Sequence, residues 1–214
     1  VLRFQRVSPM EVSIHDPEVL YYGSNKLHRT RDMGVTWETI SPALTWNPPH
    51  SQRASGWPIT RAATGEAVYS TLHSIRESVL EPGAIWVGSN DGLFHITRDN
   101  GVSWTNITPS DLPEGGRVQF LEPSPHRAGS AYYAVHRFLL GDYHPYFYRT
   151  DDYGKKWKKI SDDTIQGYAL SLAEDPVDPE LLFLGTEFGL YLSVDGGKNW
   201  FKWTHGVPTV SVMD

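Results

Sequence analysis

Short runs of β-branched and aromatic residues alternate with turn residues along the whole chain. Four of these runs resemble one another: "VLYYGS" at 19–24, "AIWVGS" at 84–89, "AYYAV" at 131–135 and "LLFLGT" at 181–186. A second run follows each of them after a turn, as in "LFHIT" and "LYLSV". Short alternating runs bounded by turn residues are typical of antiparallel strands, so the pattern predicts an all-β protein.

An eight-residue box follows the second run of every group. It reads "TRDMGVTW" at 30–37, "TRDNGVSW" at 97–104, "TDDYGKKW" at 150–157 and "SVDGGKNW" at 193–200. We expect Asp to accept backbone N–H groups in a tight hairpin, Gly to supply a positive φ, and Trp to cover the outer edge. The box is therefore expected to be structural, and its residues are Asp32, Gly34, Trp37, Asp99, Gly101, Trp104, Asp152, Gly154, Trp157, Asp195, Gly197 and Trp200.

The spacing of the boxes predicts a β-propeller. The last two box aspartates, at 152 and 195, are separated by nearly the length of a four-stranded blade, which is about 40–50 residues. We expect four blades and the start of a fifth, forming part of a larger ring. The predicted bounds are 1–41 for blade one, 67–108 for blade two, 116–161 for blade three, 167–204 for blade four and 208–214 for the fifth, with a loop insertion at 41–67.

The composition argues against several classes of function but does not identify one. The 214 residues carry a formal charge of −6 with no basic block, which argues against nucleic acid as a partner. No apolar run is long enough to insert in a membrane. The chain has no cysteine, and its nine histidines are scattered, so we expect neither a cofactor nor a metal site. It begins at Val1 without a signal-peptide pattern, and we expect both ends to be cuts in a longer protein.

The stretches 83–126, 142–160 and 181–200 resemble a bacterial family of sortilin-like (VPS10-type), Asp-box (BNR) glycosyl-hydrolase-like β-propellers. The box also matches the S/T-x-D-x-G-x-x-W motif of sialidases. The resemblance covers nearly the whole chain, and it implies a larger propeller that is secreted or periplasmic. An incomplete ring exposes apolar blade faces, so we expect the remaining blades on another chain or segment.

Loop topology predicts where a ligand would bind. Successive hairpin loops alternate between the two ends of a blade, so the boxes lie at one end and the insertions 41–67 and 136–146 lie at the other. Long loops on a rigid scaffold commonly carry binding sites. The predicted ligand-binding residues at this loop-rich end are Arg53, Trp57, Arg61, Arg137, Tyr143 and His144.

The leading interpretation is a non-catalytic module of an exported sortilin-like protein, which binds a protein or glycan at the loop-rich end. The alternative is a glycoside hydrolase, sialidase-like or xyloglucanase-like, which needs two carboxylates across a cleft. Its weak catalytic candidates are Asp91, Asp142 and Glu187. A third interpretation is a structural subunit of a larger assembly.

Overall fold

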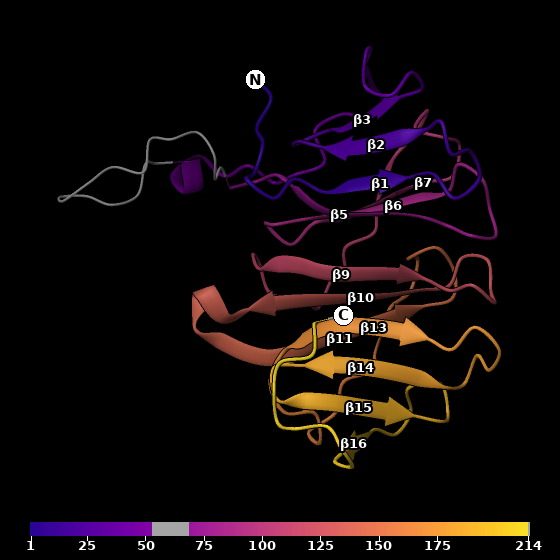
Figure 1. Cartoon of the computed structure of the whole chain (residues 1–214). Coiled ribbons are helices and arrows are strands. Elements are labelled where there is room, and N and C mark those ends of the chain that lie inside the picture. The colour runs from indigo at the N-terminus through magenta and orange to yellow at the C-terminus, as the bar shows by residue number, and fades with distance from the viewer. Residues whose placement is uncertain (53–68, 214) are drawn as a thin grey trace.

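The computed structural model describes residues 1–52 and 69–213, and these residues form four antiparallel sheets of four strands each (Figure 1). The first sheet contains β1 (Met10–Val12), β2 (Leu20–Gly23), β3 (Leu27–Thr30) and β4 (Glu38–Thr39), and the second contains β5 (Leu72–Glu77), β6 (Ile85–Ser89), β7 (Phe94–Thr97) and β8 (Thr105–Asn106). The third contains β9 (Arg117–Pro123), β10 (Ala131–Arg137), β11 (Asp142–Thr150) and β12 (Lys158–Lys159). The fourth contains β13 (Ala169–Glu174), β14 (Leu182–Thr186), β15 (Gly189–Ser193) and β16 (Phe201–Trp203), and two 3₁₀ turns are η1 (Pro49–Gln52) and η2 (Phe138–Leu140).

Each sheet is one propeller blade, because its strands pair in chain order. The first strands β1, β5, β9 and β13 follow one another through the molecule, and blades one and four lie at opposite ends of the arc (Figure 1). The predicted all-β, partial β-propeller fold is confirmed. Within the described residues, no helix is both long and apolar enough to cross a membrane.

The box closes its hairpin through two side chains. In the first box the Thr30 hydroxyl accepts the Gly34 N–H at 2.9 Å, and the Asp32 carboxylate accepts the Thr36 N–H at 2.9 Å. The same two backbone bonds recur in the other three boxes at 2.8–2.9 Å. Hydrogen bonds from Thr36 and Thr30 lower the pKa of Asp32 to about 2, so its carboxylate is ionised at neutral pH and is unsuited to act as an acid.

The box tryptophans join each blade to the one before it. Trp104 Nε1 donates to the Ile40 carbonyl at 2.8 Å, Trp157 to Ile107 at 2.6 Å and Trp200 to Ile160 at 2.9 Å. Trp37 lies in the first blade, where no described blade precedes it. Its indole N–H bonds the Gly34 carbonyl of its own box at 3.1 Å, and the residue is 44% exposed. The indole is therefore an inter-blade contact wherever a preceding blade is present.

The hydrophobic core lies between neighbouring blades. Its three clusters combine residues of blades one and two, of two and three, and of three and four. In the middle cluster the rings of Phe94 and Tyr133 stack across the interface with centroids 4.5 Å apart. Blades of this kind stabilise one another, as the units of repeat proteins do.

The box glycines at these interfaces have no room for a side chain. Gly154 has a φ of +78°, and a Cβ there would lie 2.6 Å from the Ile107 Cβ of the preceding blade. Gly141 has nearly the same φ of +75° but nothing within 4 Å of the corresponding point. Backbone strain is thus matched between the two sites, and only steric overlap differs.

We expect Gly154→Ala to lose about 2 kcal/mol more stability than Gly141→Ala, since overpacking a tight interface costs about 1–3 kcal/mol. Denaturant unfolding of the two variants beside the unchanged protein measures the difference. An equal loss of stability in both variants would show that the close approach of Gly154 to Ile107 does not affect the free energy of unfolding.

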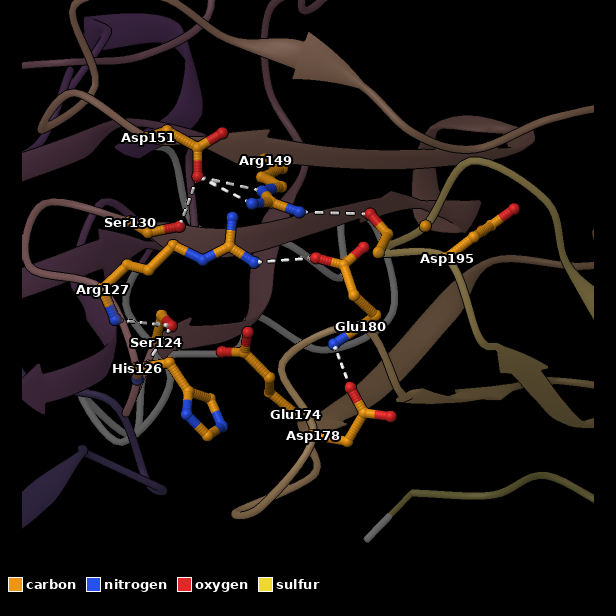
Figure 2. Close-up of polar contacts among 12 residues, drawn as sticks. Ser124, His126, Arg127, Ser130, Arg149, Asp151, Glu174, Asp178, Glu180 and Asp195 are labelled. Carbon is orange, nitrogen blue, oxygen red and sulfur yellow. Dashed lines mark hydrogen bonds and ion pairs between the residues drawn. The ribbon is translucent and has the colours of Figure 1, made fainter.

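Polar contacts cross the box-side end of blades three and four. Figure 2 shows Arg127 donating to Glu180 at 3.2 Å and Arg149 donating to the Gly196 carbonyl at 3.2 Å. Asp151 accepts a hydrogen bond from Arg149 at 2.9 Å, which holds the guanidinium over the interface. Partly exposed pairs of this kind contribute little to the free energy of unfolding, so their main effect is to orient one blade against the next.

The C-terminal segment returns to the innermost edge of blade four. The Val212 N–H donates to the Thr186 carbonyl at 3.0 Å, and Leu72 at the start of β5 makes the same bond to Ser24 of blade one at 2.7 Å. Val212 therefore lies where a next blade's first strand begins, although residues 208–213 form no strand. The predicted blade bounds stay predictions.

Candidate functional site

The loop-rich end lies opposite the boxes. In Figure 1 the long hairpin of β10 and β11, with η2 at its tip, projects to the left, and the β15 end that leads into the fourth box points to the right. The starts of β5, β9 and β13 and the turn after β14 belong to the left-hand end. Side chains from blades two, three and four therefore gather there.

Asp142 organises the tip of the β10–β11 hairpin. Its Oδ2 accepts Arg137 Nε at 2.9 Å and the Tyr146 hydroxyl at 2.8 Å, and its Oδ1 lies 2.9 Å from His144 Nδ1. Partial burial acts to raise the pKa of Asp142, but the hydrogen bonds from His144, Tyr146 and Arg137 outweigh burial and hold it well below its ordinary range. Asp142 is therefore an ionised carboxylate with both oxygens engaged.

Arg137 also clamps a second loop onto the hairpin. Its Nη1 donates to the carbonyl oxygens of Pro113 at 2.9 Å and Gly115 at 3.0 Å, and also to that of Glu114. Its side chain is only 12% exposed. These contacts indicate an internal clamp, and the ligand-binding role that the sequence predicted for Arg137 stays a prediction.

Tyr143 and His144 lie beside an open hollow of about 540 Å³. Its lining includes both residues together with Asp142, Ile165 and Gly167. Tyr143 is 60% exposed, and the His144 side chain is 78% exposed. Exposed aromatic faces at the rim of a hollow are suited to stacking on sugar rings.

Glu187 approaches the same hollow from blade four. A Cβ built at Gly167 would lie 3.2 Å from Glu187 Oε2, so this carboxylate packs over a lining residue of the hollow. Among the described residues its side chain makes no hydrogen bond or ion pair. Of the three candidate carboxylates, Asp142 therefore lines this hollow and Glu187 lies beside one of its lining residues.

Asp91 is a buried carboxylate with a structural role. It is 1% exposed, accepts the Ser89 hydroxyl at 2.5 Å, and accepts the backbone N–H groups of Trp46 and Asn47 at 2.9 and 3.2 Å. The carboxylate ties the connection after blade one to blade two and does not face solvent. The sequence-based suggestion of a catalytic Asp91 does not fit this position, since a general acid or base must reach the substrate.

Three predicted ligand-binding residues, Arg53, Trp57 and Arg61, lie outside the described residues. Their predicted role stays a prediction. The same holds for most of the 41–67 insertion.

The structure reveals a carboxylate pair that the sequence reasoning missed. Glu11, Arg76 and Glu122 occupy equivalent positions in the first strands of blades one, two and three, and each faces the second-strand residue Tyr21, Trp86 or Tyr132. Arg76 lies 2.8 Å from Glu11 and 3.8 Å from Glu122. Burial, against the opposing effect of Arg76, raises the pKa of Glu122 to about 7. Aligning the first strands of the blades would have found this row.

Another hollow lies away from the loop-rich end. It has a volume of about 850 Å³ and lies on the outer edge between blades two and three, along Asn106, Tyr153 and Trp157. A smaller hollow of about 400 Å³ beside Ile40 and Gly101 lies at the matching place between blades one and two. Both follow from the way a box docks on the previous blade. Nowhere in the part of the chain that the structure describes do three metal-ligating side chains gather.

The sequence was compared with family models and with single known proteins. No family model matches the chain, but two enzymes are similar to part of it. It is 34% identical over 127 residues to a xyloglucanase from a Paenibacillus species, and 33% identical over 112 residues to an oligoxyloglucan-reducing end-specific xyloglucanase from Emericella nidulans. The matches cover 55% and 49% of this chain but only 12% and 13% of those enzymes.

Solved structures match over nearly the whole chain. The GH74 xyloglucanase from Xanthomonas campestris gives a TM-score of 0.65 at 21% identity, covering 92% of this chain and 29% of the enzyme. An ancestral GH74 enzyme gives 0.69 at 15% identity, covering 96% and 25%. The chain has a glycosyl-hydrolase-like β-propeller fold. The extracellular domain of a putative hybrid two-component system from B. thetaiotaomicron gives 0.57 at 13% identity, covering 94% and 25%.

These comparisons correct the functional interpretation. The non-catalytic binding module inferred from sequence is wrong, because both curated relatives are polysaccharide-cleaving enzymes and point to the alternative, a glycoside hydrolase. The general resemblance to glycosyl-hydrolase-like propellers is confirmed, while its sortilin-like part stays a prediction. The sequence argument looked for a catalytic signature in local spacing, whereas the candidate carboxylates Asp142 and Glu187 belong to different blades.

Proposed function

We propose that this chain is a propeller segment of a glycoside hydrolase that acts on a polysaccharide of the xyloglucan type. The proposal is carried by one observation in the structure together with the sequence relatives. The relatives by sequence are xyloglucanases, and at the loop-rich end Asp142 lines an open hollow while Glu187 lies beside Gly167 of its lining. A polymeric substrate also suits the secreted or periplasmic location that the resemblance implied.

The two carboxylates suit different tasks. Asp142 is held ionised by Arg137, His144 and Tyr146, which fits a negative charge that stabilises the oxocarbenium-like transition state of glycoside hydrolysis. Glu187 has no internal partner among the described residues and is the candidate for the acid that protonates the leaving oxygen. Tyr143, exposed at the rim, would stack on a sugar ring and place the glycosidic bond.

We expect Glu187→Gln and Asp142→Asn each to lower xyloglucan cleavage at least about 100-fold, which is the usual contribution of general acid–base catalysis. The measurement is the release of reducing ends by the full protein, with unfolding midpoints recorded for each variant. Glu18→Gln is the matched control, because Glu18 is exposed at the box end and far from the hollow. Full turnover in both variants, or no cleavage of xyloglucan by the unchanged protein, would contradict the proposal.

A further inference from the structure

Arg117 is a half-buried cation with no carboxylate partner in the part of the chain that the structure describes. It opens β9 at the loop-rich end, and among the described residues its guanidinium makes no hydrogen bond or ion pair. Burial lowers its pKa, and no acidic group opposes that effect. A partly desolvated charge is costly unless it is paired, so a position of this kind calls for an anionic partner.

Two histidines flank Arg117. His136 is its cross-strand partner in β10, and His73 lies on β5, which packs beside β9 (Figure 1). Burial and the Arg117 charge lower the pKa of both imidazoles to about 4. Both histidines are therefore neutral at pH 7, and of these three side chains Arg117 is the one that carries a charge.

The surroundings of Arg117 are polar and lead toward Glu187. Gln119 Oε1 lies 2.8 Å from His136 Nε2, and the other ring nitrogen of His136 is buried without a partner. The His136 ring also lies 5.5 Å from Tyr168, whose carbonyl accepts the N–H of Glu187. Arg117 and the proposed acid are thus linked through two adjoining residues.

We propose that Arg117, flanked by His73 and His136, forms a subsite for the carboxylate of an acidic sugar, so that the bound polysaccharide carries uronic acid residues. The inference rests on the proposed glycoside hydrolase function and specifies its substrate class. A guanidinium matches a carboxylate in two-point geometry, and such charge-assisted hydrogen bonds are about twice as strong as neutral ones. The names of the xyloglucanase relatives mention no acidic group, so this subsite would specify a xyloglucan-type polymer that carries uronic acid.

The test compares a xyloglucan oligosaccharide that carries a glucuronic acid residue with the same molecule after its carboxyl group is reduced to an alcohol. Calorimetric titration of the full protein is expected to show about 10-fold tighter binding of the acid, in line with the worth of a hydrogen bond to a charged group. Arg117→Gln should abolish this preference, and Arg117→Lys should keep part of it. Arg31→Gln removes a cation from the exposed box end and should change nothing.

The outcomes separate the two proposals. Equal affinity for both sugars, or a preference that survives in Arg117→Gln, overturns the subsite and leaves the hydrolase proposal standing. No binding of either sugar together with no xyloglucan cleavage overturns both. Because Arg117 has no internal partner, Arg117→Gln should leave the unfolding midpoint unchanged or raise it, and a marked fall would show that the residue is structural.

Discussion

Replacing Trp200 with alanine is expected to lower the free energy of unfolding by about 3–5 kcal/mol, the usual cost of removing a large buried aromatic side chain. Trp200 is 5% exposed, packs in the cluster between blades three and four, and donates to the Ile160 carbonyl. The same substitution at Trp37 should cost about 1 kcal/mol, because that indole is partly exposed and bonds only its own box. Urea unfolding followed by circular dichroism measures both.

The two tryptophans occupy the same position of the same motif, so the comparison isolates the contact with the preceding blade. If both substitutions cost the same, the indole acts within its own hairpin and the inter-blade explanation is wrong. A small effect at both sites would contradict the explanation as well.

The second large effect is expected at Asp91. Alanine there removes the acceptor of the Ser89 hydroxyl and of the Trp46 and Asn47 N–H groups. Unpaired buried donors cost about 1–3 kcal/mol each, so we expect a total loss of about 3 kcal/mol. Asp178→Ala is the control, because Asp178 accepts one N–H in an exposed turn, and it should cost less than about 1 kcal/mol.

Unfolding midpoints of the Asp91 and Asp178 variants test this assignment, and xyloglucan cleavage by Asp91→Asn adds a second criterion. A variant that keeps its stability but loses cleavage would identify Asp91 as catalytic. Parallel loss of stability and cleavage, or loss of stability alone, agrees with a structural carboxylate.

The repeated box was enough to predict the fold because its chemistry is local. Asp32, Gly34 and Trp37 lie within one hairpin, and turn geometry follows from residue type at fixed spacing. The role of the first box position was missed, because the Thr30 hydroxyl acts as an acceptor only once the turn has formed. The partner of each indole was missed for a similar reason, since it belongs to another blade.

The candidate site was harder to predict from the sequence, because its side chains come together only through the arrangement of the blades. Asp142 and Glu187 are far apart in the chain and carry no shared motif, yet Asp142 lines the hollow and Glu187 lies beside Gly167 of its lining. Arg137 was predicted to be a ligand-binding residue because it lies in a long loop, and its clamp on 113–115 depends on a segment that local pattern does not place. The pairing of Arg117 with His136 depends on strand register, and that register includes an irregularity between Ala134 and Val135.

The most direct test of the central claim is hydrogen–deuterium exchange of the full protein with and without a xyloglucan oligosaccharide. If the loop-rich ends of blades three and four hold the substrate, amide protection should rise at 137–146, at 165–168 and around Glu187. The four box hairpins at the opposite end should not change. Protection confined to the box hairpins or to the outer hollow along Trp157, or no change anywhere at saturating sugar, would contradict the placement of the site.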